Sequence, residues 1–277
     1  IREFLARLRA WIERLEPGSE FRDRLRSSLD RTFGPDGTYG VFVRSDTNVE
    51  DQDNFNGAGL NLTIFNLKSL DDIYSGIKQV WASPFTYRSF SWRQTLIDEP
   101  LWVLPSVVIL ESIPSEKSGV LVTADIESGD QMKMLIATSE GVGGAVDGTP
   151  AETLLWSEEG VELVTQFKSH YRRLLKAEGG SEVVPATGSD YVLSDDEVAA
   201  LTAAARKISE SLEPARDPAG APRAWDIEFG FAEGKLWLFQ VRPFIGNENM
   251  QNVPALAALE SGSTSTAGTI SLGDMVK

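Results

Sequence analysis

The stretch RAWDIEFGFAEGKLWLFQVRPF, residues 223–244, alternates apolar and polar side chains on both sides of Glu233 and Gly234. Because successive side chains in a strand point to opposite faces, this alternation predicts two β-strands joined by a tight turn. A three-residue loop from Ala232 to Gly234, with Gly234 left-handed, would gather the polar residues on one face and the aromatic residues on the other. A two-residue turn would scatter them. The polar residues are Asp226, Glu228, Gln240 and Arg242.

The polar face of this hairpin has two interpretations. One is an ordinary amphipathic hairpin whose polar side meets water. The other follows from its composition, since the carboxylate of Glu228 and the amide oxygen of Gln240 are hard ligands of the kind that Mg²⁺ prefers. Beside them, the guanidinium of Arg242 has the fork geometry that suits a phosphate. This combination favours a site for a metal-bound nucleotide.

Length and composition limit the folds and functions that the chain can have. With 277 residues, of which 42% are hydrophobic, the chain can bury a substantial core as one large domain or as two lobes around a cleft. Its net charge of -15 argues against nonspecific binding to nucleic acid or to an anionic membrane. The absence of cysteine excludes disulfides and a catalytic thiol, and makes a cytoplasmic location the default expectation. No apolar run is long enough to span a bilayer.

Helical periodicity appears in four regions of the chain. Apolar residues recur every three or four positions from Ile1 until Pro17, and a second helix is expected over 19–33. Further helices are expected over 70–96, interrupted at Pro84. A capping box of Ser194 and Glu197 precedes an alanine-rich helix.

Strands are predicted between these helices by β-branched and alternating runs. The segment 163–180 reads as a strand passing into a helix that ends at a glycine pair. Trp81, Trp92 and Trp102 are expected to pack in the core. The remaining predicted strands cover 39–45, 101–109, 118–129 and 131–144.

The domain organisation follows from the change in composition after Gly246. Residues 1–246 are expected to form one nucleotide-binding domain. Residues 247–277, rich in Ser, Thr, Gly and Ala, are expected to be a flexible tail or an interdomain linker. Because the chain starts at Ile1, it is expected to be a piece of a longer protein.

Five segments, in this order, resemble the nucleotide-binding domain of phosphoenolpyruvate synthases and pyruvate phosphate dikinases, and also that of glucan and phosphoglucan water dikinases. Any one of them is a weak signal, but the ordered series is specific. The segments are VFVRSDTNVEDQDNFNGAGLNLT (41–63), VWASPFTYRSFSWR (80–93), SGVLVTADIESG (118–129), SEGVGGAVDG (139–148) and WDIEFGFAEGKLWLFQVRP (225–243).

The resemblance implies an α+β, ATP-grasp-like fold with mixed or antiparallel sheets, in which two lobes clamp ATP. It implies ATP and Mg²⁺ as cofactors. The function it implies is that of an ATP- and Mg²⁺-binding module in a dikinase-like phosphotransferase, in which phosphoryl groups pass to a histidine on a separate domain. The expected partners are ATP and the phosphohistidine and phosphoenolpyruvate- or pyruvate-binding domains of a parent protein, with no nucleic acid and no membrane.

The resemblance also implies roles for the residues that match its motifs. Arg44 and Arg242 would contact the phosphates as catalytic residues, while Glu228 and Gln240 would hold Mg²⁺. A strand end would serve as the hinge that meets the adenine edge, two arginines would contact phosphate or a lid, and a glycine loop would lie near phosphate or ribose. These additional residues are Glu111, Ser112 and Ile113 of the hinge, Arg88 and Arg93, and Gly141 and Gly143.

Some positions depart from the family pattern and leave a second hypothesis open. Nothing before Gly40 resembles the family's Gly-Gly-Lys segment, so the domain is expected to be incomplete at its N-terminus. Family polar residues are replaced at Leu62, Leu110, Ala124 and Gly144. The alternative is therefore a degenerate ATP-grasp domain that acts as a regulatory or scaffold binding module. The lone histidine, His170, lacks a phosphohistidine context and is assigned no catalytic role.

Overall fold

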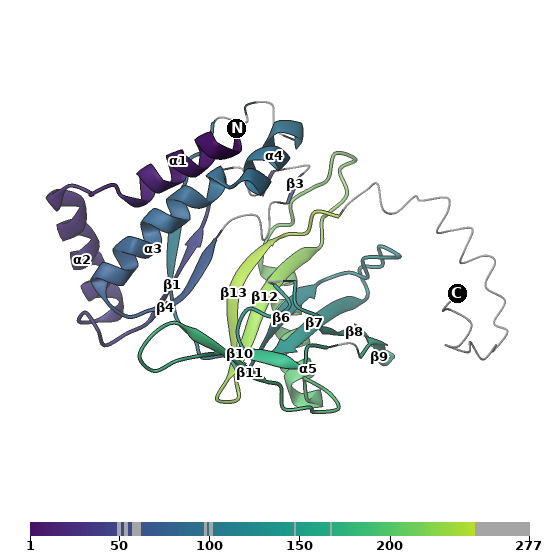
Figure 1. The fold of residues 1–277 in the computed structure, drawn as a ribbon. Helices are drawn as coiled ribbons and strands as arrows, with labels where there is room; N and C mark the ends of the chain where they lie inside the picture. Colours follow the sequence, from purple (N-terminus) through teal and green to yellow (C-terminus); the bar gives the residue numbers. More distant parts are fainter. Residues whose placement is uncertain are drawn as a thin grey trace, which may run out of the picture. The chain divides into compact units, whose positions relative to one another are not determined.

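The computed structural model describes residues 1–48, 51–52, 55–56, 62–96, 99, 102–146, 148–166 and 168–246. The chain divides into two units, Ile1–Ile245 and Gly246–Lys277. All the described helices and strands belong to the first unit (Figure 1). This unit is an α+β fold in which every pair of named strands is antiparallel, which confirms the predicted fold class at that level.

The N-terminal part of this unit places helices against a three-stranded sheet. The strand order is β4-β1-β5, with β1 at Val41–Ser45, β4 at Thr63–Leu67 and β5 at Val107–Glu111. The helices are α1 (Arg2–Glu13), α2 (Ser19–Phe33), α3 (Leu70–Ala82), the 3-10 turn η1 (Ser83–Phe85) and α4 (Tyr87–Leu96).

Within the described chain, no helix is both long and apolar enough to cross a membrane.

Alternation along β1 separates the two faces of this sheet. Val41 and Val43 are fully buried in a core that includes Ile73 and Ile77 of α3. The intervening residues of β1 and its neighbours point to the opposite face, because side chains alternate along a strand. We call this the inner face; its residues are Phe42, Arg44, Phe65, Val108 and Leu110.

The second sheet has six strands in the order β13-β12-β6-β7-β8-β9. One face packs against α5 (Asp195–Ser211), where Ile227 and Phe229 of β12 join Leu201 in a buried core. Asp226 and Glu228 must therefore point to the other face. The strands are β6 (Lys117–Val122), β7 (Met134–Glu140), β8 (Glu152–Ser157), β9 (Gly160–Thr165), β12 (Trp225–Ala232) and β13 (Lys235–Pro243).

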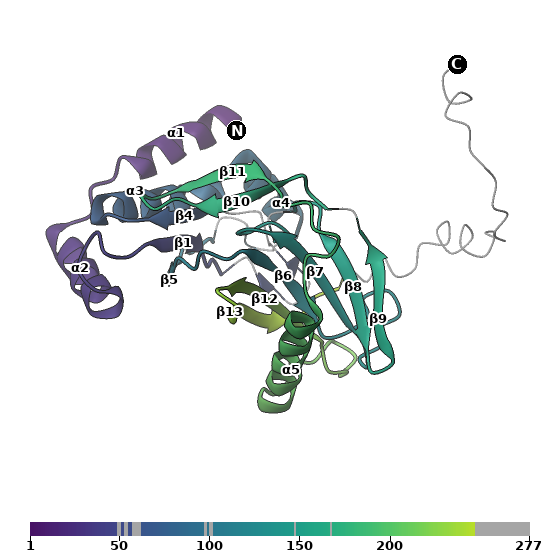
Figure 2. The ribbon, with the colours of Figure 1, turned by 90° about the horizontal axis from the view of Figure 1, so that it is seen from below.

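Two small hairpins complete the fold. One pairs β2 (Asp51–Gln52) with β3 (Phe55–Asn56), and the other pairs β10 (Tyr171–Leu175) with β11 (Ser181–Pro185). Seen from below, the turn end of the β10–β11 hairpin reaches β4 (Figure 2), where Asn66 donates to the carbonyl of Lys176. It therefore links segments of the two sheets that are far apart in the sequence.

The turn between β12 and β13 differs from the expected three-residue loop. Ala232 pairs with Lys235, so the turn contains only Glu233 and Gly234, both at positive φ (53° and 71°). A β-bulge in β13 then shifts the register, since Phe229 pairs with Leu238 but Glu228 pairs with Gln240. The bulge adds the residue that the shorter turn lacks, and so the polar residues still share one face.

The conformation of this turn predicts how a substitution at Glu233 changes the stability of the protein. A two-residue turn with both central residues at positive φ favours Asn-Gly, whereas glutamate at the first position is strained. Glu233→Asn is expected to raise the free energy of unfolding by about 0.5–1 kcal/mol. Chemical denaturation measures the change; an unchanged or lower midpoint would contradict it.

The segment 163–180 does not contain the expected helix. Its second half forms β10, which pairs with β11 through Arg172↔Val184 and Arg173↔Val183. Gly179 and Gly180 have φ values of 115° and 68° and shape the connecting turn. The helical propensity of this segment is overridden by the β-branched partner strand that follows the glycines.

The predicted strand over 101–109 is shorter than expected, because β5 begins only at Val107. The amide side chain of Asn48 holds the preceding loop, donating to the carbonyl of Trp102 (3.2 Å) and accepting from the amide of Leu104 (2.7 Å).

Trp102 and Trp92 are 66% and 50% exposed, so the expectation that they pack in the core is wrong. Trp81 does pack against the core beneath the three-stranded sheet.

The capping box of α5 is present and is linked to the six-stranded sheet. Ser194 and Glu197 cap each other's backbone amides, and Lys117 of β6 lies 2.6 Å from the Glu197 carboxylate. Burial opposes ionisation of Glu197, but the hydrogen bonds from Lys117 and Ser194 outweigh it and lower its pKa below the usual 4.5. The carboxylate is therefore more acidic in the folded than in the unfolded chain.

This shift predicts a pH dependence of stability. Because the folded pKa is depressed, the stabilisation is fully present above the unfolded pKa and is lost as pH falls through the folded value. Glu197→Gln is expected to reduce the free energy of unfolding at pH 7 by about 1–2 kcal/mol, through loss of the charge-assisted bonds. Denaturation at pH 7 and near pH 3 should show the difference shrinking in acid; an equal difference at both would contradict the assignment.

Candidate functional site

The polar residues of β12 and β13 form a compact cluster. Asp226 lies opposite Arg242 and Glu228 lies opposite Gln240 in the antiparallel ladder. Directly opposed residues in such a ladder share a face. Asp226 and Glu228 are each only 6% exposed, although carboxylates are seldom buried without partners. We call these four residues the β12–β13 polar cluster.

Arg44 joins this cluster from the other sheet. It lies on the inner face of β1 and donates from Nη1 to Oε2 of Glu228 (3.1 Å) and from Nη2 to Oε1 of Gln240 (2.7 Å). The Arg44 side chain is 25% exposed and that of Glu228 is 9% exposed, so water screens this pair only partly. The carboxylate and the amide oxygen thus converge on a single cationic group. Arg44, Glu228 and Gln240 are therefore in direct contact, and their expected roles toward phosphate and Mg²⁺ remain predictions.

The sequence predicted no ligand-binding role for Asp226, although its side chain lies in the cluster. Its Oδ2 accepts a hydrogen bond from Nε of Arg242 at 2.8 Å. Its Oδ1 is buried without a hydrogen-bond partner among the described residues. Strand alternation already placed Asp226 beside Glu228 on one face, which was the signal available in the sequence. An unpaired buried carboxylate oxygen is costly, and it can accept a further donor or a cation.

The residues expected to form a hinge lie at the other end of the three-stranded sheet from Arg44. Glu111 pairs with Val41, three residues before Arg44 in β1, which is a separation of roughly 10 Å along the strand. The amide of Ser112 donates to the carbonyl of Gly40 at 2.9 Å, and Ile113 is buried. Arg44 and the hinge residues therefore lie at opposite ends of the three-stranded sheet, with Glu111 on the face opposite to that of Arg44. An adenine contact at the hinge remains a prediction.

The glycine loop after β7 is held in a conformation that requires glycine. Gly141 and Gly143 have φ values of 81° and 75°. A Cβ at Gly141 would lie 2.3 Å from the carbonyl oxygen of Arg173, and the Ser118 hydroxyl donates to the carbonyl of Gly141 at 2.6 Å. These contacts give the loop a fixed shape; its proposed contact with phosphate or ribose remains a prediction.

Two of the predicted arginines lie in α4, and the described part of the structure does not bring them to the β12–β13 polar cluster. Arg88 is exposed. Arg93 is 3% exposed, donates to the carbonyl of Pro84, and lies 6.0 Å from the ring centroid of Phe85. Burial lowers the pKa of Arg93. Arg93 therefore has a packing role that its sequence context did not reveal.

The structure also locates the departures from the family motifs. Leu110 lies on the inner face opposite Phe42, where it removes a polar side chain from the sheet. A Cβ at Gly144 would lie 2.1 Å from Oγ of Ser139, so a larger residue there requires that side chain to move. Glu50 and residues 57–61, which belong to the motif at 41–63, lie outside the described residues.

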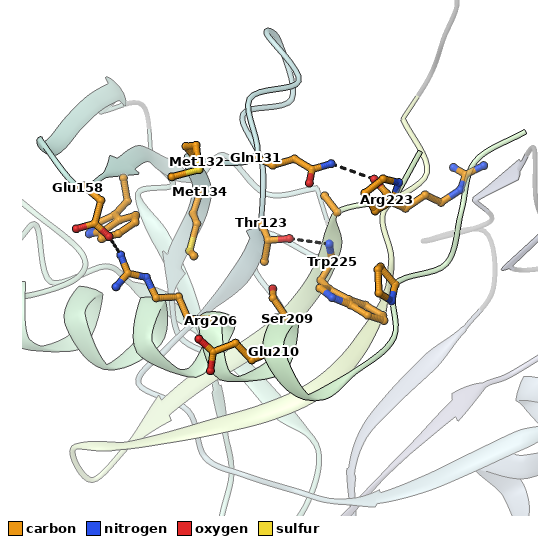
Figure 3. A pocket seen from close by; sticks show the side chains of 14 residues that line it. Thr123, Gln131, Met132, Met134, Glu158, Arg206, Ser209, Glu210, Arg223 and Trp225 are labelled. Carbon is orange, nitrogen blue, oxygen red and sulfur yellow. Dashed lines mark hydrogen bonds and ion pairs between the residues drawn. The ribbon is translucent and has the colours of Figure 1, made fainter. Parts of the chain in front are cut away.

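A cavity of about 590 Å³ lies elsewhere on the protein, beside α5 (Figure 3). Its lining includes Trp225, Met134 and Arg206, and none of the β12–β13 polar cluster. Trp225 points to the α5 face of β12, and its amide donates to the Thr123 hydroxyl at 2.8 Å. The cavity and the cluster therefore lie on opposite faces of the sheet, and the candidate site for metal and nucleotide is the cluster.

Comparison with known proteins gives an independent result. The family described as "Pyruvate phosphate dikinase, AMP/ATP-binding domain" matches residues 1–262. A probable phosphoenolpyruvate synthase of Methanothermobacter thermautotrophicus is 29% identical over 223 residues, covering 78% of this chain and 31% of that protein. Phosphoenolpyruvate synthase of Pyrococcus furiosus is 28% identical over 256 residues, covering 85% and 30%. Rifampicin phosphotransferase of a Streptomyces species is 28% identical over 249 residues, covering 88% and 27%. The chain spans less than a third of the length of each of these relatives.

Proposed function

Because the chain belongs to the pyruvate phosphate dikinase AMP/ATP-binding domain family, we propose that it binds ATP together with Mg²⁺ and supplies phosphoryl groups to a histidine on a separate domain of a dikinase-like phosphotransferase. The observation that carries this proposal is the convergence of Glu228 and Gln240 on Arg44. That convergence brings together metal-type and phosphate-type groups from two sheets.

The cluster fits Mg²⁺ by its donor chemistry. The oxygens of Glu228 and Gln240 already contact one cationic group, so a single cation can reach both. Among the described residues, no group of three or more His, Cys, Asp or Glu side chains could hold a metal by itself. Mg²⁺ is commonly held by one or two protein carboxylates together with substrate phosphates and water. The donor set therefore supports a metal that binds with a polyphosphate rather than alone.

The charge balance supports the same order of binding. Arg44 and Arg242 offset the charges of Glu228 and Asp226, so the site is close to neutral in its present state. A metal ion added alone would meet two guanidinium groups, whereas a metal–nucleotide complex brings compensating negative charge. We propose that Arg44 exchanges its carboxylate partner for phosphate oxygens when the nucleotide binds.

The chemistry then depends on neutralisation and positioning. Bound Mg²⁺ would neutralise charge that develops on the phosphates. Arg44 and Arg242 would orient the phosphate chain through charge-assisted hydrogen bonds, and the buried surroundings would strengthen those bonds. Two separate hydrophobic cores, one under each sheet, support the view that the sheets act as two lobes of an ATP-grasp-type clamp.

The acceptor domain is part of the proposal. The chain spans 31% or less of the three relatives described above, and transfer through a histidine requires a domain beyond the described residues. The final acceptor would be selected by such domains. The present chain would then bind the nucleotide and supply the phosphoryl groups.

Titration calorimetry of the chain with ATP, with and without Mg²⁺, tests this function. We expect saturable binding that strengthens when Mg²⁺ is present and weakens about tenfold to one-hundredfold in Arg242→Met, which loses a phosphate contact. Arg206→Met, which removes the same charge beside α5, is the matched control and should bind as the wild type does. No metal-dependent binding by the wild type would refute the proposal and favour a degenerate scaffold module.

A further inference from the structure

The β10–β11 hairpin is attached at its base to the six-stranded sheet. The carbonyl of Arg173 accepts from the amide of Val142 at 2.9 Å, and Gly141 forms a parallel bridge with Arg173. Two residues after the end of β11, the amide and hydroxyl of Thr187 donate to the Glu140 carboxylate (2.8 and 2.7 Å). The hairpin is thus joined directly to the glycine loop that follows β7.

The tip of the same hairpin is fastened to the three-stranded sheet by Asn66. Its Nδ2 donates to the carbonyls of Lys176 (2.7 Å) and Gly180 (3.1 Å), and its own carbonyl accepts from the amide of Gly180 (2.9 Å). Asn66 is 3% exposed. Its amide group therefore makes these bonds away from water, where losing a partner is expensive.

The backbone around Asn66 is shaped for this contact. Asn66 has φ of 54°, in the left-handed region, and lies where the register of β1 and β4 shifts. Asparagine tolerates this region better than most residues, and a bulge there redirects the side chain. A Cβ on Gly40 would lie 2.2 Å from Oδ1 of Asn66, so the neighbouring strand leaves room for the amide only because it has glycine.

The hairpin lies on the side of the sheet that carries the candidate site. The guanidinium of Arg173 lies over the ring of Phe65 at 4.7 Å, and Phe65 packs edge-on against Phe42 at 5.3 Å between centroids. Phe42 and Phe65 belong to the inner face, as does Arg44. The hairpin therefore runs from the glycine loop to the inner face (Figure 2).

We propose that the β10–β11 hairpin is a strap that closes the candidate nucleotide site, with Asn66 as the latch that holds its tip. The identity of the ligand rests on the proposed function, but the latch itself does not. Opening requires the Asn66 bonds and the Arg173–Phe65 contact to break, after which the hairpin remains attached at its base. Asn66 acts as a positioning residue, because it connects to the glycine loop through the strap.

The absence of cysteine in the chain allows a direct test by a reversible cross-link. A Cβ at Gly179 would lie 3.8 Å from the Cβ of Lys68, close to the average separation in disulfides. The variant Lys68→Cys/Gly179→Cys is expected, when oxidised, to release a fluorescent methylanthraniloyl-ATP in Mg²⁺ buffer at least about tenfold more slowly than the same protein after reduction. The two single-cysteine variants, treated identically, are the controls. Equal release rates in the oxidised and reduced double variant would overturn the proposal.

Hydrogen exchange tests the latch without nucleotide. Asn66→Gly keeps the left-handed backbone accessible but removes the amide donors, so the Gly180 amide is expected to exchange roughly tenfold faster than in the wild type. Amides inside the β10–β11 ladder should keep their protection, because the hairpin detaches as a unit. Unchanged exchange at Gly180 would overturn the latch. A wild type that does not bind the ATP analogue would instead refute the proposed function and leave this second measurement valid.

Discussion

Glu228→Gln is expected to remove the metal-dependent part of ATP binding, weakening affinity in Mg²⁺ buffer by about one-hundredfold while leaving metal-free binding nearly unchanged. The substitution preserves the shape of a side chain that is 6% exposed. It removes the one carboxylate that, with the Gln240 amide, faces the Arg44 cation. Calorimetric titrations with and without Mg²⁺ measure the two affinities separately.

The control for Glu228→Gln must change charge equally without touching the site. Glu158→Gln satisfies this requirement, because Glu158 lines the cavity beside α5 and pairs with Arg206. It is expected to retain the affinity and the Mg²⁺ dependence of the wild type. If Glu228→Gln kept its Mg²⁺ dependence, the β12–β13 polar cluster would not be the metal site. If both variants lost it equally, net charge would be responsible instead.

The hairpin over 223–244 shows how far alternation alone can predict a site. It placed Asp226 and Glu228 on one face of a strand, and the structure has them there. The turn length was predicted wrongly, yet the polar face survived because the bulge in β13 shifts the register by one residue. Nothing in local propensity identifies a bulge at Phe239, since its position depends on pairing across the sheet.

Contacts between distant segments were harder to predict. Arg44 is 184 residues from Glu228, and their meeting was inferred from the resemblance to a family rather than from spacing. The strap was missed because its sequence, with Leu, Lys, Ala and Glu, favours a helix in isolation. Asn66 gave no recognisable signal, since its partners lie more than 100 residues away and are backbone carbonyls.

Gly141→Ala is expected to destabilise the protein and to disturb the connection between the strap and the glycine loop. Alanine is strained at φ of 81°, and its Cβ would lie 2.3 Å from the backbone oxygen of Arg173, which a side-chain rotation cannot relieve. We expect the free energy of unfolding to fall by about 3 kcal/mol, of which the left-handed backbone accounts for about 1 kcal/mol. Thermal and chemical denaturation measure this loss.

Gly148→Ala separates the two causes, because Gly148 lies in the same loop at φ of 75° and a Cβ there has nothing within 4 Å. It should lose only the backbone part, about 1 kcal/mol. The difference between the two variants then measures the close approach of Gly141 to Arg173. If the glycine loop is held by the strap, Gly141→Ala should also speed exchange of the Val142 amide, which donates to Arg173, while Gly148→Ala should not. Equal stability losses and equal exchange in the two variants would mean that the loop is shaped by its own glycines and not by the hairpin.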